Sequence, residues 1–231
     1  TAERELNFLI NGTSAVGLDI NGYYAKRYGK VGLTMYGAYN SSEPYVPAGV
    51  LFSAIPRFSR YTFNPKLFLY PSEKTDISIG INTAFEDREG GDINYLRGNG
   101  DSLHSYYEDN KTQRISSQAQ LRHRFNGGEL TVKNSVSGFK RFISTPGYTF
   151  DGTQMSTFSE VNYATHKEGV EWVAGANLFT DAFSEVKLTA VPVRDYVLTT
   201  YGAFVQNTWD ISRKLSMESG LRGDYVVNYG F

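Results

Sequence analysis

The side chains that could do acid–base or metal chemistry are few in this chain of 231 residues, which contains three histidines and no cysteine. His104, His123 and His166 are expected in a loop, near a strand end and in a turn, without the paired spacing of a metal motif. Glu218, with Arg222 and Asp224, falls on one face of an expected strand, which favours a charge network over an acid–base pair. We therefore predict no catalytic residue, no metal site, no cofactor and no enzymatic activity.

Two other patterns could bind ions or phosphate, but each is better explained as a loop or turn. The acidic run 86–92 lacks the ligand spacing of an EF-hand calcium loop. The glycines at 90–91, 98–100 and 127–128 do not follow a strand and open a helix, as a phosphate-binding loop requires. The net charge of −1 and the lack of a long basic run argue against nucleic acid as a partner.

Binding chemistry is better represented, in two sets of residues. Aromatic rings and arginines gather in the expected long loops, where they could contact an aromatic or anionic ligand or simply pack the loops together: Tyr45, Phe52, Arg57, Tyr95, Arg97, Tyr106, Tyr107, Tyr148 and Phe150. Five cations are expected on the water-facing side of strands, where they would attract an acidic ligand or pair with Asp19, Glu86 and Glu160: Arg60, Lys66, Arg114, Arg122 and Arg124.

The elements that must position these residues are β-strands. Seventeen tyrosines, 15 phenylalanines and 23 glycines suit long strands joined by tight turns. Apolar and polar residues alternate over segments of about ten residues, as in 215–225, where Leu215, Met217, Leu221 and Tyr225 oppose Ser216, Glu218, Arg222 and Asp224. The same alternation runs through 60–70 and 76–86. This pattern predicts a sheet with one apolar and one polar face.

About eleven strands are expected, near residues 4–11, 15–27, 30–41, 59–71, 75–87, 112–125, 129–142, 155–165, 170–182, 196–210 and 214–228. Short turns alternate with long loops, expected near 42–58, 88–111, 143–154 and 183–195, as in outer-membrane barrels. Mean hydropathy is −0.38, and no stretch approaches the roughly 18 apolar residues of a membrane-spanning helix. Strand length and loop asymmetry favour a transmembrane barrel over a soluble β-sandwich, which stays open as an alternative.

Two details of these strands can be checked against a structure. Aromatic residues near strand ends could form a belt at the lipid–water boundary: Tyr24, Tyr28, Tyr39, Tyr70, Phe125, Trp209 and Tyr225. Pro65 removes a ladder hydrogen bond from an expected strand, so we expect a bulge or an unpaired carbonyl there.

One hairpin carries a family resemblance. Residues 201–209, YGAFVQNTW, followed by a short turn and GLRGDY at 220–225, resemble a hairpin that recurs in the barrels of TonB-dependent receptors. The segments 63–68, 85–91 and 132–136 are similar to Bacteroidetes-type siderophore receptors of that family. The resemblance extends over residues 1–231.

The resemblance implies an antiparallel up-and-down transmembrane β-barrel of approximately 22 strands, of which residues 1–231 would be the first half, without the plug domain. No signal peptide is visible at Thr1, so the chain is expected to be mature or a fragment. The implied function is TonB-dependent uptake of a scarce, bulky nutrient, above all an iron–siderophore complex, across the bacterial outer membrane. The implied partners are outer-membrane lipid, the remaining half of the barrel, and the TonB–ExbB–ExbD system acting through the plug. A passive porin or structural barrel is the alternative.

Overall fold

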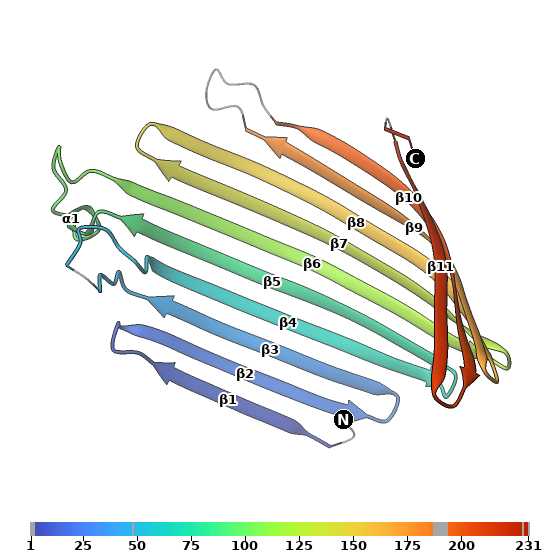
Figure 1. Ribbon diagram of the computed structural model, residues 1–231. Coiled ribbons are helices and arrows are strands. Elements are labelled where there is room, and N and C mark those ends of the chain that lie inside the picture. Colours follow the sequence, from blue (N-terminus) through green and yellow to red (C-terminus); the bar gives the residue numbers. More distant parts are fainter. Residues whose placement is uncertain (1–2, 48, 187–193, 228, 231) are drawn as a thin grey trace.

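The structure is a computed structural model that describes residues 3–47, 49–186, 194–227 and 229–230. Its eleven strands form one antiparallel sheet in which each strand pairs with the next in the chain (Figure 1). The strands are β1 (Glu5–Gly12), β2 (Gly17–Tyr28), β3 (Val31–Ser42), β4 (Arg57–Ser72), β5 (Thr75–Gly91), β6 (Tyr107–Phe125), β7 (Gly128–Thr145), β8 (Tyr148–Lys167), β9 (Val170–Glu185), β10 (Tyr196–Ser212) and β11 (Leu215–Val226). The predicted all-β, up-and-down architecture is confirmed.

Helical structure is confined, in the described residues, to the single turn α1 (Ile93–Leu96) between β5 and β6. No described helix has the length and apolar content needed to cross a membrane. Five connections at one end of the sheet, which we call the turn end, have only two residues each, and the longest connections lie at the opposite, long-loop end. The predicted alternation of short and long connections is confirmed except between β7 and β8, where the connection at the long-loop end also has only two residues.

Few apolar side chains are buried in this sheet. Among the described residues, only Ala25, Ile93 and Leu96 are buried hydrophobic residues, and no large side chain is fully buried. Phe8 is 75% exposed and Leu221 76% exposed, although both are strongly apolar. A β-sandwich would bury such residues between two sheets, so the soluble alternative is wrong. A single layer with outward apolar side chains suits hydrocarbon on that side.

The strand register places the apolar and polar residues on opposite faces. Directly paired residues share a face, and one row of partners across β3 to β6 runs Leu33, Leu67, Ile79 and Ala119, whereas the row one residue away runs Thr34, Lys66, Gly80 and Gln118. We call these the apolar face and the polar face. The same parity puts all five predicted water-facing cations on the polar face: Arg60, Lys66, Arg114, Arg122 and Arg124.

Six of the seven residues of the predicted aromatic belt lie on the apolar face, where such a belt requires them. Tyr24, Tyr28, Tyr39, Phe125, Trp209 and Tyr225 have the parity of the apolar face. At the long-loop end Tyr39 contacts Tyr61, with ring centroids 4.9 Å apart, and at the turn end the hydroxyls of Tyr24 and Tyr28 lie 2.8 Å apart. Tyr70 has the opposite parity, and its ring lies under the Arg27 guanidinium on the polar face.

Several strands are longer than predicted at the long-loop end. The loop expected at 143–154 is a two-residue turn, because β7 continues to Thr145 and β8 begins at Tyr148. The loop expected at 88–111 shrinks to 92–106. The added residues mix charged, polar and aromatic side chains on each face, so the alternation that reveals the other strands is lost there. Part of the loop expected at 183–195, residues 187–193, and residue 228 of the last expected strand lie outside the described residues.

Pro65 interrupts the ladder without a bulge. Its strand keeps one register with β5, from Phe63 opposite Thr83 to Lys66 opposite Gly80, and only the pairs between these are missing. The Asn64 side-chain oxygen accepts a hydrogen bond from the Thr83 backbone N–H at 3.3 Å. Of the two expected alternatives, the bulge is therefore wrong, and the ladder instead lacks the β5 pairs of Asn64 and Pro65.

Candidate functional site

The polar face is laced by ion pairs between neighbouring strands. Arg60 pairs with Glu86, as the sequence suggested for this arginine. Glu160 pairs with Lys133 at 2.9 Å, and Asp19 instead accepts hydrogen bonds from the amides of Asn40 and Asn11. Most of the charged side chains described on the polar face therefore have a partner on a neighbouring strand.

Two of the predicted cations contact rings and not carboxylates. The Lys66 ammonium lies 5.2 Å from the centre of the Phe68 ring, and the Arg114 guanidinium lies 4.9 Å from the centre of the Phe139 ring. Within the described part of the chain neither cation forms an ion pair. Such cation–π contacts hold a cation in place while leaving its charge uncompensated.

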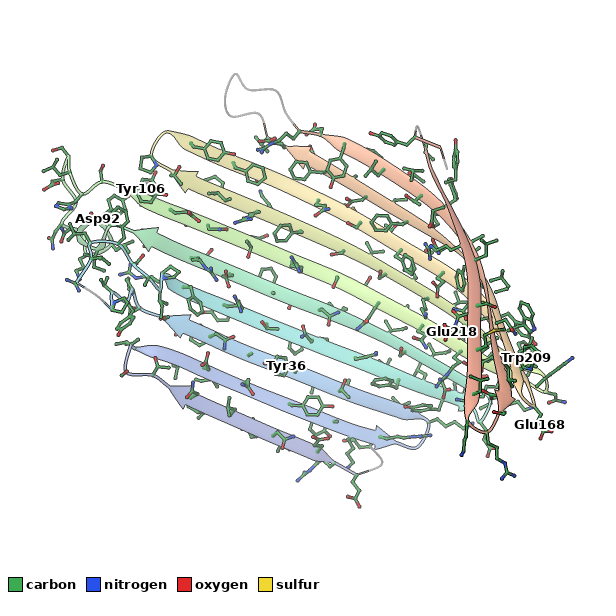
Figure 2. The ribbon with its side chains drawn as sticks, viewed as in Figure 1. Tyr36, Asp92, Tyr106, Glu168, Trp209 and Glu218 are labelled. Atoms are coloured by element: carbon green, nitrogen blue, oxygen red, sulfur yellow. The ribbon has the colours of Figure 1, made fainter. Side chains whose placement is uncertain are left out.

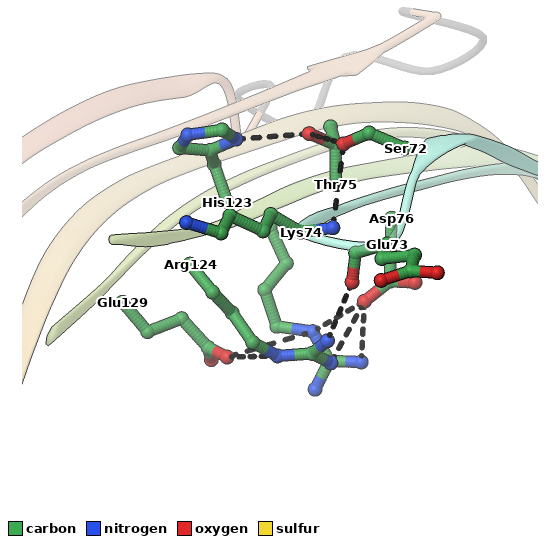
Figure 3. Close-up of polar contacts among 9 residues, drawn as sticks. Ser72, Glu73, Lys74, Thr75, Asp76, His123, Arg124 and Glu129 are labelled. Atoms are coloured by element: carbon green, nitrogen blue, oxygen red, sulfur yellow. Dashed lines mark hydrogen bonds and ion pairs between the residues drawn. The ribbon is translucent and has the colours of Figure 1, made fainter. Parts of the chain in front are cut away.

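A denser network closes the turn end of β5, β6 and β7 (Figure 3). Arg122 and Arg124 both bond one carboxylate oxygen of Asp76, each at 3.0 Å. Arg124 also lies 3.3 Å from Glu129 and donates to the backbone carbonyl of Glu73. Beside it, the Thr75 hydroxyl lies 2.9 Å from Nδ1 of His123. These predicted water-facing arginines therefore tie strands together at the turn end.

Two long loops at the opposite end pack on each other, and we call residues 43–56 and 92–106 together the loop cap. The Ile93 backbone N–H donates to the Leu51 carbonyl at 2.7 Å, and Ser53 donates to Gly91. The rings of Phe52 and Tyr106 lie 5.8 Å apart. Figure 2 places Asp92 and Tyr106 together at this end, remote from Glu168 and Trp209 at the turn end.

A buried carboxylate organises the cap. Asp92 accepts hydrogen bonds from the Asn94 backbone N–H and from Nδ1 of His104, both at 2.8 Å. Burial acts to raise the pKa of Asp92, but the bonds from His104 and from the backbone outweigh burial and lower that pKa. The bond to Asp92 raises the pKa of His104, against a smaller opposing effect of burial. This loop histidine is structural, as far as its contacts show.

A second aromatic group lies at the long-loop end of β8, β9 and β10, on the polar face. The rings of Phe150 and Phe183 stack 6.2 Å apart, and Phe183 stacks on Tyr196 at 5.7 Å. Arg194 lies 5.2 Å from the Phe150 ring, bonds Glu185 at 2.7 Å and donates to the Tyr148 hydroxyl. We call these residues the mouth cluster.

The nine predicted ligand-binding residues are thus divided between two places. Tyr45, Phe52, Arg57, Tyr95, Arg97, Tyr106 and Tyr107 lie in or beside the loop cap, and Tyr148 and Phe150 lie in the mouth cluster. Arg57, Tyr107, Tyr148 and Phe150 belong to strands and not to the predicted loops. Arg57 and Tyr107 also have the parity of the apolar face, unlike Phe150.

Sequence reasoning missed Phe183, Tyr196 and Asp181. Asp181 accepts hydrogen bonds from Ser156 at 2.6 Å and from the Tyr196 hydroxyl at 2.8 Å. The signal for Phe183 and Tyr196 would have been the register, because they are direct partners on β9 and β10. No group of three or more metal-binding side chains occurs among the residues that the structure describes.

Comparison with known proteins gives a fold and no close relative. No protein-family model matches the sequence, and no curated protein matches it. Among solved structures, the chain superposes on the copper transporter OprC with a TM-score of 0.78 at 14% identity, covering 97% of this chain and 37% of OprC. The alcaligin outer-membrane receptor FauA from Bordetella pertussis matches with a TM-score of 0.78 at 13% identity, covering 97% of this chain and 36% of FauA.

The ferric-catecholate import receptor Fiu from E. coli K12 is similar as well, with a TM-score of 0.74 at 9% identity, covering 97% of this chain and 44% of Fiu. The chain therefore spans less than half the length of each of these transport proteins. The similarity to these structures and the single sheet with one apolar face both indicate a β-barrel wall. The chain therefore has the fold of part of the β-barrel of these transport proteins.

Proposed function

We propose that this chain forms part of the wall of a TonB-dependent receptor that imports a scarce, bulky nutrient, an iron–siderophore complex, across the bacterial outer membrane. The long-loop end faces the outside and the apolar face meets lipid. The polar face lines a water-filled lumen, where a plug domain moves when the TonB–ExbB–ExbD system supplies energy.

The observation that carries this proposal is the contrast between the two faces. The polar face holds ion-paired and ring-bound cations along its length, whereas the apolar face exposes residues such as Phe8 and Leu221. A wall with these two faces separates hydrocarbon from an aqueous interior. The similar structures include a copper transporter and receptors for alcaligin and ferric enterobactin, and this likeness supports metal-complex cargo.

The mouth cluster suits the first contact with cargo. Phe150, Phe183 and Tyr196 offer stacked ring faces on the polar side, and Arg194 adds a charge that is 61% exposed. Flat or anionic chelates bind to such a combination by stacking and by charge-assisted hydrogen bonds.

The test is uptake of radioactive iron by cells that produce the full-length receptor, supplied as ferric catecholate, hydroxamate and citrate-type complexes. Uptake of one class is expected, and it should disappear in cells without TonB. Phe183→Ala should weaken binding, whereas Met155→Ala, a control at the same end but on the apolar face, should not. Uptake that persists without TonB would instead establish a passive porin.

A further inference from the structure

A cavity of about 900 Å³ at the long-loop end lies on the apolar face and not on the polar face. Its floor is one row of register partners across six strands, β2 to β7: Leu18, Ser41, Ser59, Asp87, Lys111 and Phe142. Every residue in this row has the parity of the outward, apolar side chains. The cavity therefore opens to the outside of the wall, away from the lumen.

The position of the cavity along the membrane normal follows from the next row of register partners toward the turn end. Over β2 to β5 that row contains Ile20, Tyr39, Tyr61 and Phe85, which are apolar or aromatic, and over β6 and β7 it continues with the polar Gln113 and Lys140. The cavity row itself brings Ser41, Ser59, Asp87 and Lys111. Aromatic rings prefer the boundary between hydrocarbon and headgroups. The floor of the cavity is thus at headgroup level, immediately above the apolar band.

The walls of the cavity carry both signs of charge. Arg57 lies 3.3 Å from Glu43 and 3.4 Å from Glu89, and Lys111 lies 3.4 Å from Asp109. Asp87 forms no ion pair with any residue that the structure describes. The lining thus holds four carboxylates against Arg57 and Lys111 on the apolar face, and a third cation, Arg88, which pairs with Glu86 on the polar face. This excess of acceptors fits a ligand with many hydroxyl donors better than one that carries phosphate alone.

A pair of stacked rings completes the lining. Tyr95 of the loop cap stacks on Tyr107 with centroids 5.0 Å apart and planes inclined by 12°. An aromatic face beside carboxylates offers a sugar ring both a surface for its C–H groups and acceptors for its hydroxyls. Arg57 and Lys111 add donors for a phosphate on the same headgroup.

We propose that this cavity binds the sugar headgroup of a glycolipid of the surrounding outer leaflet, with the acyl chains lying along Ile20, Tyr39 and Tyr61. The inference rests on the proposed orientation of the barrel, with the long loops outside, and it concerns a site separate from the cargo path. It also gives Arg57, Tyr95 and Tyr107 a role that differs from cargo capture.

The test uses the full-length protein purified in detergent and micelles doped with fluorescent lipopolysaccharide. Asp87→Asn combined with Lys111→Gln should weaken lipopolysaccharide binding about tenfold, as expected for the loss of charged hydrogen-bond partners. Glu108→Gln is the matched control, because Glu108 lies on the same strand as Lys111, three residues nearer the loops, but on the polar face. Tyr95→Ala is a second test, because Tyr95 lies in α1, outside the strands, and its loss should leave the sheet folded. This variant should also weaken lipopolysaccharide binding, even if the double variant fails to fold.

Wild-type affinity in both the double variant and Tyr95→Ala would overturn the proposal. Equal weakening by Glu108→Gln would overturn it as well, because the effect would not belong to the apolar face. Equally tight binding of micelles doped with phosphatidylethanolamine would show a phospholipid site and overturn the assignment to a glycolipid. Ferric siderophore binding by the same variants should stay unchanged. A failure of the cargo proposal is therefore seen in siderophore binding, and a failure of the glycolipid proposal in lipopolysaccharide binding.

Discussion

Nδ1 of His104 lies 2.8 Å from a carboxylate oxygen of Asp92, whose side chain is only 4% exposed. This contact joins the start and the end of the loop between β5 and β6, and so holds one half of the loop cap closed. Asp101 accepts the His104 backbone N–H at 2.9 Å, and its charge also acts to raise the pKa of His104.

The contact predicts a pH window for the order of the loop cap. The raised pKa of His104 means that its contribution is complete below the ordinary value of 6.5 and is lost as the pH rises through the folded value. The lowered pKa of Asp92 means that its contribution is present above the ordinary value of 3.8 and is lost as the pH falls through the folded value. The cap should therefore be most ordered between these two ordinary values.

Hydrogen exchange of residues 92–106, corrected for the intrinsic rate at each pH, measures this window. Protection should decrease from pH 6 to pH 9 in the wild type. The His104→Gln variant keeps a donor but cannot titrate, so its protection should not change over this range. Identical pH profiles for the two proteins would refute the role of the histidine.

Removal of Asp76 should weaken the turn end more than removal of an isolated surface carboxylate. Asp76→Asn takes one partner from both Arg122 and Arg124. Because these arginines are about two-fifths exposed, the expected loss is modest, about 1 kcal/mol. Thermal unfolding in detergent measures it, and Asp210→Asn, at an exposed position, is the control. Equal effects of the two substitutions would contradict the network.

Gly175 should tolerate no side chain, because a Cβ there would lie 2.6 Å from the Phe204 ring and 2.8 Å from the Val161 carbonyl oxygen. Gly175→Ala should destabilise the protein by about 1–3 kcal/mol through overpacking. Gly223→Ala adds the same methyl group where no atom lies within 4 Å, so it should be neutral or slightly stabilising. Chemical denaturation of both variants tests the difference, and equal destabilisation would count against tight packing at Gly175.

A charge should be tolerated on one face of β4 and rejected on the other. Leu67→Arg puts a cation on the apolar face and should cost about 2–4 kcal/mol near the middle of a bilayer. Thr62→Arg puts it on the polar face, where the direct partners Ala38 and Ala84 leave room. The measurement is the yield of folded protein in the outer membrane. Normal yield for Leu67→Arg would contradict the assignment of the apolar face to lipid.

The strands and their faces could be predicted from sequence only where apolar and polar residues alternate. Leu215, Met217 and Leu221 recur with the period of a strand, so the eleven strands and their faces could be predicted from sequence. At the long-loop end, residues such as Asp109, Lys111 and Lys140 put charge on the apolar-parity face. Alternation fails there, and Tyr148 and Phe150 were expected in a loop although they begin β8.

The sequence by itself determined the all-β class, the two faces and the short turns, because these follow from the two-residue period of a strand and from local turn chemistry. Only the tertiary structure decided which carboxylate serves which cation, as with Lys133 and Glu160, and that Arg57 lies on the apolar face beside the loop cap. Both depend on the register between strands and on how distant loops pack, which no local pattern in one chain encodes.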